Sequence, residues 1–217
     1  SSPADSTVIL WDAKTGMETA NLSCKQGVFD ICFSPDGTAL SLCNYSGIQI
    51  YNAKSKKLIT ELTGSFSNSM FSPDGKMLVS GGDNLRLWDS RTWRQIKALP
   101  KEFLGKAKFS PDGSFIVSHG YEVHFWNVRA ASPLNSLPGP YSPILCLDFY
   151  PDGAHIVGLW KYPAIQRLDM KTCLQDGTWE EKTPITSVCV FPDGNHVAVA
   201  SEKGNIQIRD GKSGKII

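Results

Sequence analysis

The chain lacks an apolar run long enough to cross a membrane, and it carries almost no net charge. A membrane-spanning helix needs about 18 or more apolar residues in succession, and the N-terminus has neither the basic nor the apolar region of a signal peptide. The 22 lysines and arginines offset 21 aspartates and glutamates, which leaves a net charge of +1. This balance predicts no nucleic-acid partner and no membrane partner. We therefore expect a cytoplasmic protein, with the nucleus as the alternative compartment.

Histidine is scarce, and the usual arrangements of catalytic or metal-binding side chains are missing from the sequence. The four histidines are His119, His124, His155 and His196. None has a cysteine or carboxylate at the spacing of metal ligands, and two of them follow a Pro-Asp-Gly turn at one offset, which a repeat explains. The glycine-rich stretch Gly211–Lys215 lacks the glycine spacing of a phosphate-binding loop. The sequence thus predicts no metal, no cofactor and no enzymatic activity.

Disulfides are not expected either. Four of the six cysteines, Cys32, Cys43, Cys146 and Cys189, lie inside apolar runs that are typical of strands. A buried free thiol behaves in such a run as a small apolar side chain. We therefore expect free, buried cysteines.

What the chain does have is a repeat. Its markers are Phe33-Ser-Pro-Asp-Gly37, Phe71-Ser-Pro-Asp-Gly75, Phe109-Ser-Pro-Asp-Gly113, Phe149-Tyr-Pro-Asp-Gly153 and Phe191-Pro-Asp-Gly194. A second marker, Trp-Asp or a relative of it, recurs at steps of 37 to 42 residues, at Trp11-Asp12, Tyr51-Asn52, Trp88-Asp89, Trp126-Asn127, Leu168-Asp169 and Arg209-Asp210. Periods near 40 residues, with short β-rich segments between turns, predict the blades of a β-propeller.

Each repeat contains four short strands, named a to d in chain order. In the second repeat we expect strand a at 28–33, b at 39–43, c at 47–51 and d at 57–62. Ser-Pro-Asp-Gly suits the turn between strands a and b, because proline presets one φ angle, aspartate bonds to nearby backbone and glycine accepts a positive φ. One such turn per repeat spaces the turn aspartates too widely for paired acid-base chemistry.

The third repeat carries a family resemblance. The segment Leu78–Asp89 resembles the b strand, turn and c strand of the WD-repeat β-propeller family. Residues 1–12 resemble the later part of the same passage, with Asp5 at the position of the family's turn aspartate. The resemblance covers essentially the whole chain. It implies an all-β propeller of four-stranded antiparallel blades, with about five to six WD-type blades present. These would be part of a seven-bladed ring or an incomplete ring, and a closed ring of five or six blades is the alternative.

The sequence departs from the family pattern before strand a. The family's Gly-His pair, whose histidine joins a buried tetrad with serine or threonine, aspartate and tryptophan, is missing from every repeat. Cys24, Ser65 and Pro140 lie in the corresponding regions. We therefore expect no complete tetrad, and we expect blade rigidity to rest on apolar packing around residues such as Trp88.

The repeats define the expected domain organisation. One propeller region spans residues 1–217, with a partial first blade at 1–23 and further blades at 24–63, 64–100, 101–138, 139–178 and 179–217. The incomplete end blades predict a segment of a larger chain or complex.

The two rims of such a propeller differ in composition. The bottom rim holds the turn aspartates and a basic series, Lys14, Lys54, Arg91, Arg129, Lys171 and Lys212, which predicts mutual neutralisation or, as the alternative, a ring for an acidic partner. The top face, formed by the b-to-c and d-to-a loops, gathers aromatic residues at Tyr45, Phe66, Phe103, Tyr121, Tyr141, Trp160, Tyr162 and Trp179, with Lys161 among them. Exposed aromatics anchor interfaces, whereas buried ones would pack against neighbouring blades.

The resemblance and the top face together indicate function. They predict a non-enzymatic scaffold that binds a protein or peptide partner through its top-face loops. The alternative is a regulatory or ligand-sensing arm of a larger multidomain signalling protein. A third hypothesis is a propeller enzyme or carbohydrate binder, but the sequence has no convergent acid, base or metal-binding groups that support it.

Overall fold

The computed structural model of the chain describes residues 7–24, 27–44, 46–99, 105–119, 122–129, 132–137, 144–160, 164–172, 174–180 and 183–217. The chain divides into two compact units, residues 1–107 and 108–217. The described residues of both units form β-strands and turns.

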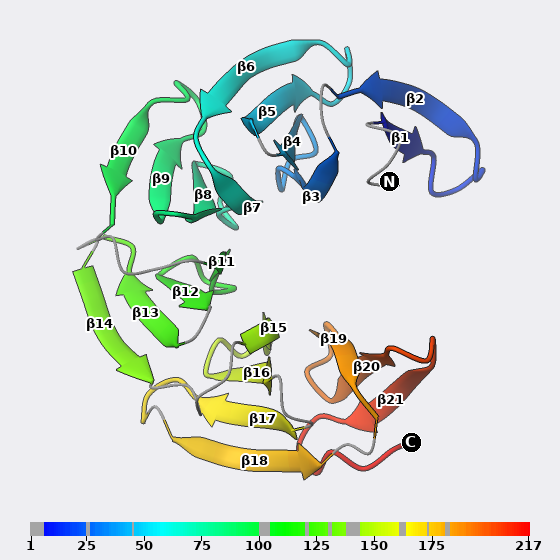
Figure 1. Cartoon of the computed structure of the whole chain (residues 1–217), viewed down its shortest axis with the longest axis vertical. Helices are drawn as coiled ribbons and strands as arrows, with labels where there is room; N and C mark the ends of the chain where they lie inside the picture. The colour runs from blue at the N-terminus through cyan, green and yellow to red at the C-terminus, as the bar shows by residue number, and fades with distance from the viewer. Residues whose placement is uncertain are drawn as a thin grey trace. The chain divides into compact units, whose positions relative to one another are not determined.

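The first unit contains three antiparallel sheets (Figure 1). The first sheet has two described strands, β1 (Thr7–Trp11) and β2 (Glu18–Ser23). The second has four, β3 (Val28–Phe33), β4 (Ala39–Asn44), β5 (Gly47–Asn52) and β6 (Leu58–Thr63). The third also has four, β7 (Phe66–Phe71), β8 (Met77–Gly82), β9 (Arg86–Asp89) and β10 (Gln95–Ala98). Within each sheet every strand pairs with the next one in the chain, which is the order expected of a blade.

The boundary between the units falls within β11, the first strand of the fourth sheet. That sheet comprises β11 (Lys106–Phe109), β12 (Phe115–His119), β13 (Val123–Asn127) and β14 (Ser132–Leu137). The fifth comprises β15 (Ile144–Phe149), β16 (His155–Trp160), β17 (Ala164–Asp169) and β18 (Gln175–Glu180), and the last has three described strands, β19 (Ile185–Val190), β20 (His196–Ser201) and β21 (Ile206–Asp210). The prediction of an all-β fold built from four-stranded antiparallel blades is confirmed.

The turn between strands a and b has the geometry that its sequence predicts. In the second blade, Gly37 has a φ of +70° and donates its backbone N–H to the carbonyl of Ser34 at 2.8 Å. Asp36 accepts hydrogen bonds from the Ser34 hydroxyl at 2.6 Å and the Thr38 N–H at 3.0 Å. The glycines at the same place in the other repeats also have positive φ, at +71° for Gly75, +72° for Gly113, +65° for Gly153 and +67° for Gly194. Only glycine adopts this conformation without a steric penalty.

Replacing one of these glycines tests the turn. We expect Gly75→Val to lower the free energy of unfolding by more than about 1 kcal/mol, because a β-branched residue fits φ > 0 badly. A Cβ at this position would have ordinary space, 3.7 Å from Pro35 Cδ, so the penalty comes from the backbone rather than from crowding. Chemical denaturation measures it, with Lys76→Val on the adjacent exposed residue as the control. Equal midpoints for the two variants would contradict the assignment.

Within each unit, the apolar core lies between consecutive sheets. In the first unit, Phe71 and Trp88 of the third sheet pack with Cys43 and Ile48 of the second. The phenylalanines that open three of the turn markers are buried, with 4% of Phe71, 2% of Phe109 and 8% of Phe149 exposed, whereas 37% of Phe191 is exposed although a four-stranded sheet precedes it. Phe33 is 51% exposed, and the sheet before it has only two described strands. Within each unit, consecutive sheets thus bury apolar side chains against one another, as expected of blades that cannot bury both faces alone.

The cysteines are free thiols, as predicted, at the five described positions, Cys24, Cys32, Cys43, Cys146 and Cys189. Burial raises the pKa of the Cys43 thiol to about 12, which makes it unreactive. The prediction of burial is wrong for Cys189, which is exposed. In β19 it alternates with the buried Val188 and Val190, so its side chain lies on the opposite side of the strand.

Candidate functional site

The two ends of each blade differ in how their polar groups are used. We call the end that carries the a-to-b and c-to-d turns the bottom end, and the end that carries the b-to-c turn and the end of strand d the top end. The bottom turns repeat from blade to blade, whereas the residues at the top end vary. A binding site therefore requires polar groups that the turns at either end leave available.

At the bottom end, the aspartates of the c-to-d turns are engaged by their own turns. Asp89 Oδ1 accepts the backbone N–H of Thr92 at 2.7 Å, that of Arg91 at 3.1 Å and the Thr92 hydroxyl at 2.8 Å. The backbone N–H of Thr92, followed by its hydroxyl, holds the pKa of Asp89 below its usual value. Asp12, Asp169 and Asp210 make the same set of hydrogen bonds. These carboxylates are turn formers, stable as anions and ill suited to proton transfer.

The basic series on the bottom end has a structural explanation in the same turns. Five of its members, Lys14, Lys54, Arg91, Lys171 and Lys212, donate their backbone N–H to the side chain two residues earlier. All five side chains are exposed. The spacing of the series therefore follows from backbone geometry.

Adjacent blades are joined by polar side chains on strand a, which the sequence did not reveal. The Asn68 amide donates to the carbonyl of Ala107 at 2.8 Å and accepts the Ala107 N–H at 2.9 Å. Asp30 Oδ2 accepts the N–H of Ser69 at 2.8 Å, within the first unit. In the second unit, Asp148 Oδ2 accepts the N–H of Val190 at 2.9 Å. In each pair the side chain belongs to the earlier blade and the backbone group to the later one.

A charged cluster lies at the bottom end of the fifth blade. His155 Nδ1 lies 2.8 Å from Asp152 Oδ2, and its Nε2 lies 3.5 Å from Asp176 Oδ2. Arg167 forms a bidentate pair with Asp176, at 2.9 Å from Nε and 2.6 Å from NH2, and its guanidinium lies over the ring of Tyr150. No group of metal-ligating side chains is found within the described part of the chain. The Arg167–Asp176 ion pair and the contacts of His155 with carboxylates tie β16, β17 and β18 together.

The Arg167–Asp176 pair predicts a pH-dependent stability. The hydrogen bonds from Arg167 hold the pKa of Asp176 below its usual value. Because the folded pKa is depressed, the stabilisation is present above the unfolded value of about 4 and is lost as pH falls through the folded value. At pH 7 we expect Asp176→Asn to cost about 1 to 2 kcal/mol, between the values for surface and buried pairs.

Thermal unfolding of Asp176→Asn and the parent chain, followed from neutral to acidic pH, checks this expectation. The difference in Tm should shrink as the pH falls. Glu202→Gln, at an exposed turn, is the matched control and should show no such trend. A difference that is constant with pH would contradict the role assigned to the pair.

Two of the aromatic residues predicted for the top face are core residues. Phe66 is the first residue of β7, 4% exposed, and its ring meets that of Trp88 edge to face at 6.1 Å. Trp179 lies in β18 opposite Ile165, is 5% exposed and packs with Tyr150. The fifth sheet therefore continues to Glu180, two residues past the predicted blade boundary. The loop placement of these two aromatics is corrected, since both side chains fill gaps between sheets.

The other predicted positions lie mostly outside the described residues. These are Tyr45, Phe103, Tyr121, Tyr141, Lys161 and Tyr162, and the turn aspartate Asp5 also falls there. Trp160 ends β16, where its backbone pairs with that of Ala164, and its side chain lies outside the described part.

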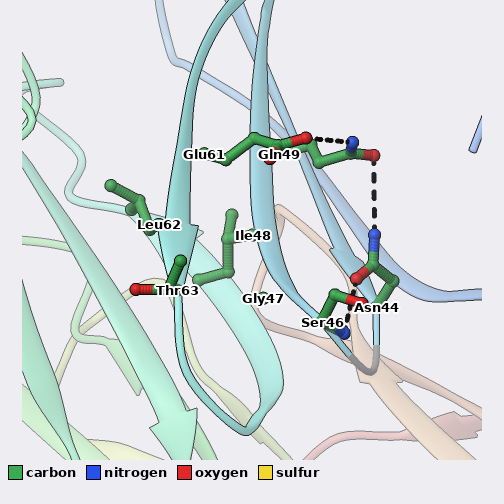
Figure 2. Close-up of a pocket in the computed structure, with 8 residues that line it drawn as sticks. All are labelled: Asn44, Ser46, Gly47, Ile48, Gln49, Glu61, Leu62 and Thr63. Carbon is green, nitrogen blue, oxygen red and sulfur yellow. Dashed lines mark hydrogen bonds between the residues drawn. The ribbon is translucent and has the colours of Figure 1, made fainter. Parts of the chain in front are cut away.

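A pocket of about 110 Å³ opens at the top end of the second blade (Figure 2). It is lined by Asn44, Ser46, Gly47, Ile48, Gln49, Glu61, Leu62 and Thr63. Asn44 and Gln49 are almost fully buried, and a chain of hydrogen bonds runs from Asn44 through Gln49 to Glu61. Sequence reasoning missed this pocket, because Gln49 and Glu61 are twelve residues apart and only the pairing of β5 with β6 brings them opposite each other.

Comparison with known families identifies the repeats. The family model described as "WD domain, G-beta repeat" matches three regions, residues 55–89, 131–160 and 172–210. The chain belongs to the WD-repeat family. WD-repeat proteins are typically non-enzymatic scaffolds, and WD-repeat domains generally bind protein partners.

Part of the WD-repeat tetrad is retained. In the third blade, Trp88 Nε1 donates to the hydroxyl of Ser80 at 2.9 Å, and in the fourth, Trp126 Nε1 donates to that of Ser118 at 2.8 Å. His119 is buried, and its Nδ1 lies 3.2 Å from the carbonyl oxygen of Ile144 in the next sheet. The tryptophan and serine positions of the WD repeat thus still form a buried hydrogen bond in these two blades.

The described part of this WD-repeat chain contains no helix of the length and apolar character that crossing a bilayer requires.

Proposed function

We propose that this WD-repeat chain is a non-enzymatic scaffold that holds a protein or peptide partner on the top-face loops of its blades. The observation that carries the proposal is the contrast between the two ends of a blade. At the bottom end the turn carboxylates bond to their own backbone, as Asp89 does to Thr92. At the top end the sequence varies, and its predicted loops contain polar and aromatic residues that the repeat itself does not require.

The partner surface in this proposal consists of the predicted loop residues other than the two core aromatics. These are Tyr45, Phe103, Tyr121, Tyr141, Trp160, Lys161 and Tyr162. Tyrosine and tryptophan supply large contact area at low cost in side-chain entropy, which suits them to anchor a partner. The near-zero net charge supports a protein partner over nucleic acid or a membrane surface, and a cytoplasmic or nuclear location belongs to the same proposal.

Paired surface variants test the proposal. One variant carries alanine at Tyr45, Tyr121, Tyr141, Trp160 and Tyr162. The matched control carries alanine at five exposed bottom-end positions, Lys14, Lys54, Arg91, Lys171 and Lys212. Quantitative affinity purification should recover partners with the control at the level of the parent chain, and the top-face variant should lose at least about tenfold, since each interface anchor contributes about 2 kcal/mol or more. Equal recovery with both variants would remove the top face from the proposal.

A further inference from the structure

Glu61 gives the second blade a carboxylate that has no counterpart in the other four-stranded sheets. In the second blade, strand pairing places Glu61 of β6 opposite Gln49 of β5. The residue in the corresponding place is Ala98 in the third sheet, Ser136 in the fourth and Thr178 in the fifth. The carboxylate is therefore not a part of the repeated architecture.

The carboxylate of Glu61 can accept further hydrogen bonds. Gln49 Nε2 donates to Glu61 Oε1 at 2.8 Å, and this is the hydrogen bond that the structure gives to the carboxylate within the described residues. An ionised carboxylate has about four acceptor sites, so most of its capacity remains. Among the described residues no lysine, arginine or histidine lies within ion-pair distance of Glu61 or lines the pocket.

Two buried amides fix the geometry of this acceptor site. Asn44 is 2% exposed and Gln49 is 8% exposed, so their polar groups are removed from bulk water. Asn44 Oδ1 accepts the N–H of Ser46 at 2.8 Å, and Asn44 Nδ2 lies 3.5 Å from Gln49 Oε1 (Figure 2). Held in this way, Gln49 presents its NH₂ to Glu61 and keeps the carboxylate oriented. Preorganised groups of this kind bind with less loss of side-chain entropy.

We propose that the pocket at the top end of the second blade binds the basic side chain, lysine or arginine, of a peptide partner, with its cationic head on Glu61. The pocket has the size of a side-chain head rather than of a larger ligand, at about 110 Å³. Among the described residues that line it, Glu61 alone is charged, and the hydroxyls of Ser46 and Thr63 add acceptors. Because Asn44 and Ser46 flank the predicted anchor Tyr45, this inference rests on the proposed top-face function and specifies the chemistry of its partner.

Blocked amino acids provide the probe, because they test the pocket without the identity of the partner. The intact chain is titrated with N-acetyl-arginine methylamide and N-acetyl-lysine methylamide, and the side-chain amide signals of Asn44 and Gln49 are followed by NMR. We expect saturable shifts of these signals with one or both probes. The neutral Nε-acetylated lysine derivative should give none, and Glu61→Gln should weaken binding at least about tenfold, since charge-assisted hydrogen bonds are the strong ones. Glu202→Gln is the matched control and should bind as the parent chain does.

A second variant separates loss of binding from loss of folding. Ser46→Phe fills the mouth of the pocket while leaving the backbone N–H that bonds to Asn44, and it should abolish the shifts in a chain that keeps its Tm. The inference is overturned if the neutral probe shifts the same signals, if Glu61→Gln binds as tightly as the parent chain, or if no probe gives a saturable shift. Partner recovery that depends on the top face but not on Glu61 would leave the scaffold role standing and remove the basic-side-chain pocket. Binding of the probes to the pocket, without any partner that depends on the top face, would support the basic-side-chain pocket and contradict the scaffold role.

Discussion

Trp88→Ala is expected to lower the free energy of unfolding by about 3 to 5 kcal/mol, the usual cost of removing a buried tryptophan. Its ring is 7% exposed and packs between the second and third sheets, edge to face with Phe66. Its Nε1 also donates to the Ser80 hydroxyl, which alanine would leave without that donor. The substitution therefore removes apolar contacts and a buried hydrogen bond at once.

Trp11→Ala is the matched control for this prediction, because Trp11 holds the same place in the first repeat. It is 61% exposed in a sheet with two described strands, so alanine there should cost less than about 1 kcal/mol. Urea denaturation followed by far-UV circular dichroism measures both, since this signal comes mainly from the backbone and the midpoint of the transition does not depend on its amplitude. If the two variants lose comparable free energy of unfolding, burial of Trp88 does not contribute specifically to the stability of the third blade.

Gly81→Ala is expected to have a comparable effect through the junction between two blades. A Cβ at Gly81 would lie 2.4 Å from the carbonyl oxygen of Gly105 and 2.6 Å from Asn68 Oδ1. The backbone oxygen cannot move away without displacing β11. Overpacking costs about 1 to 3 kcal/mol, and each of the two Asn68–Ala107 hydrogen bonds that the methyl group displaces adds about 1 kcal/mol. The sum is about 3 to 5 kcal/mol.

Gly177→Ala is the control for the second prediction, because Gly177 also lies within a strand and has no positive φ. A Cβ there would lie 3.5 Å from Arg167 Cβ, which is an ordinary van der Waals contact. Its cost should stay below about 1 kcal/mol. If Gly81→Ala unfolds at the same urea concentration as Gly177→Ala, the close approach of β8 to β11 is not a determinant of stability.

The sequence predicted those parts of the fold that depend on local chemistry. Proline, aspartate and glycine fix each bottom turn within five residues, so Gly37 and its equivalents could be placed before any contact was known. The residues between blades could not be placed in the same way. Asn68 and Ala107 are 39 residues apart, and their two hydrogen bonds exist only because neighbouring blades stack.

The residues of the candidate site also could be predicted only where local sequence determines their position. The sequence predicts loop positions for Phe66 and Trp179, whereas each is part of a strand. In the sequence, Glu61 is one residue of the predicted strand d at 57–62. Its difference from Ala98, Ser136 and Thr178 emerges only when the strands are aligned by their pairing.

The side-chain links between blades bear on how such an array can grow. Asp30, Asn68 and Asp148 each use a side chain of the earlier blade to bind the main chain of the later one. The later blade therefore needs no particular residue at the junction, because every blade offers the same peptide groups. If a gene duplication adds one repeat after such a blade, the side chain that forms the hydrogen bond to the new repeat is already present. A single substitution of that side chain removes the hydrogen bond. Repeat number in this chain can thus change by steps that do not require two simultaneous mutations.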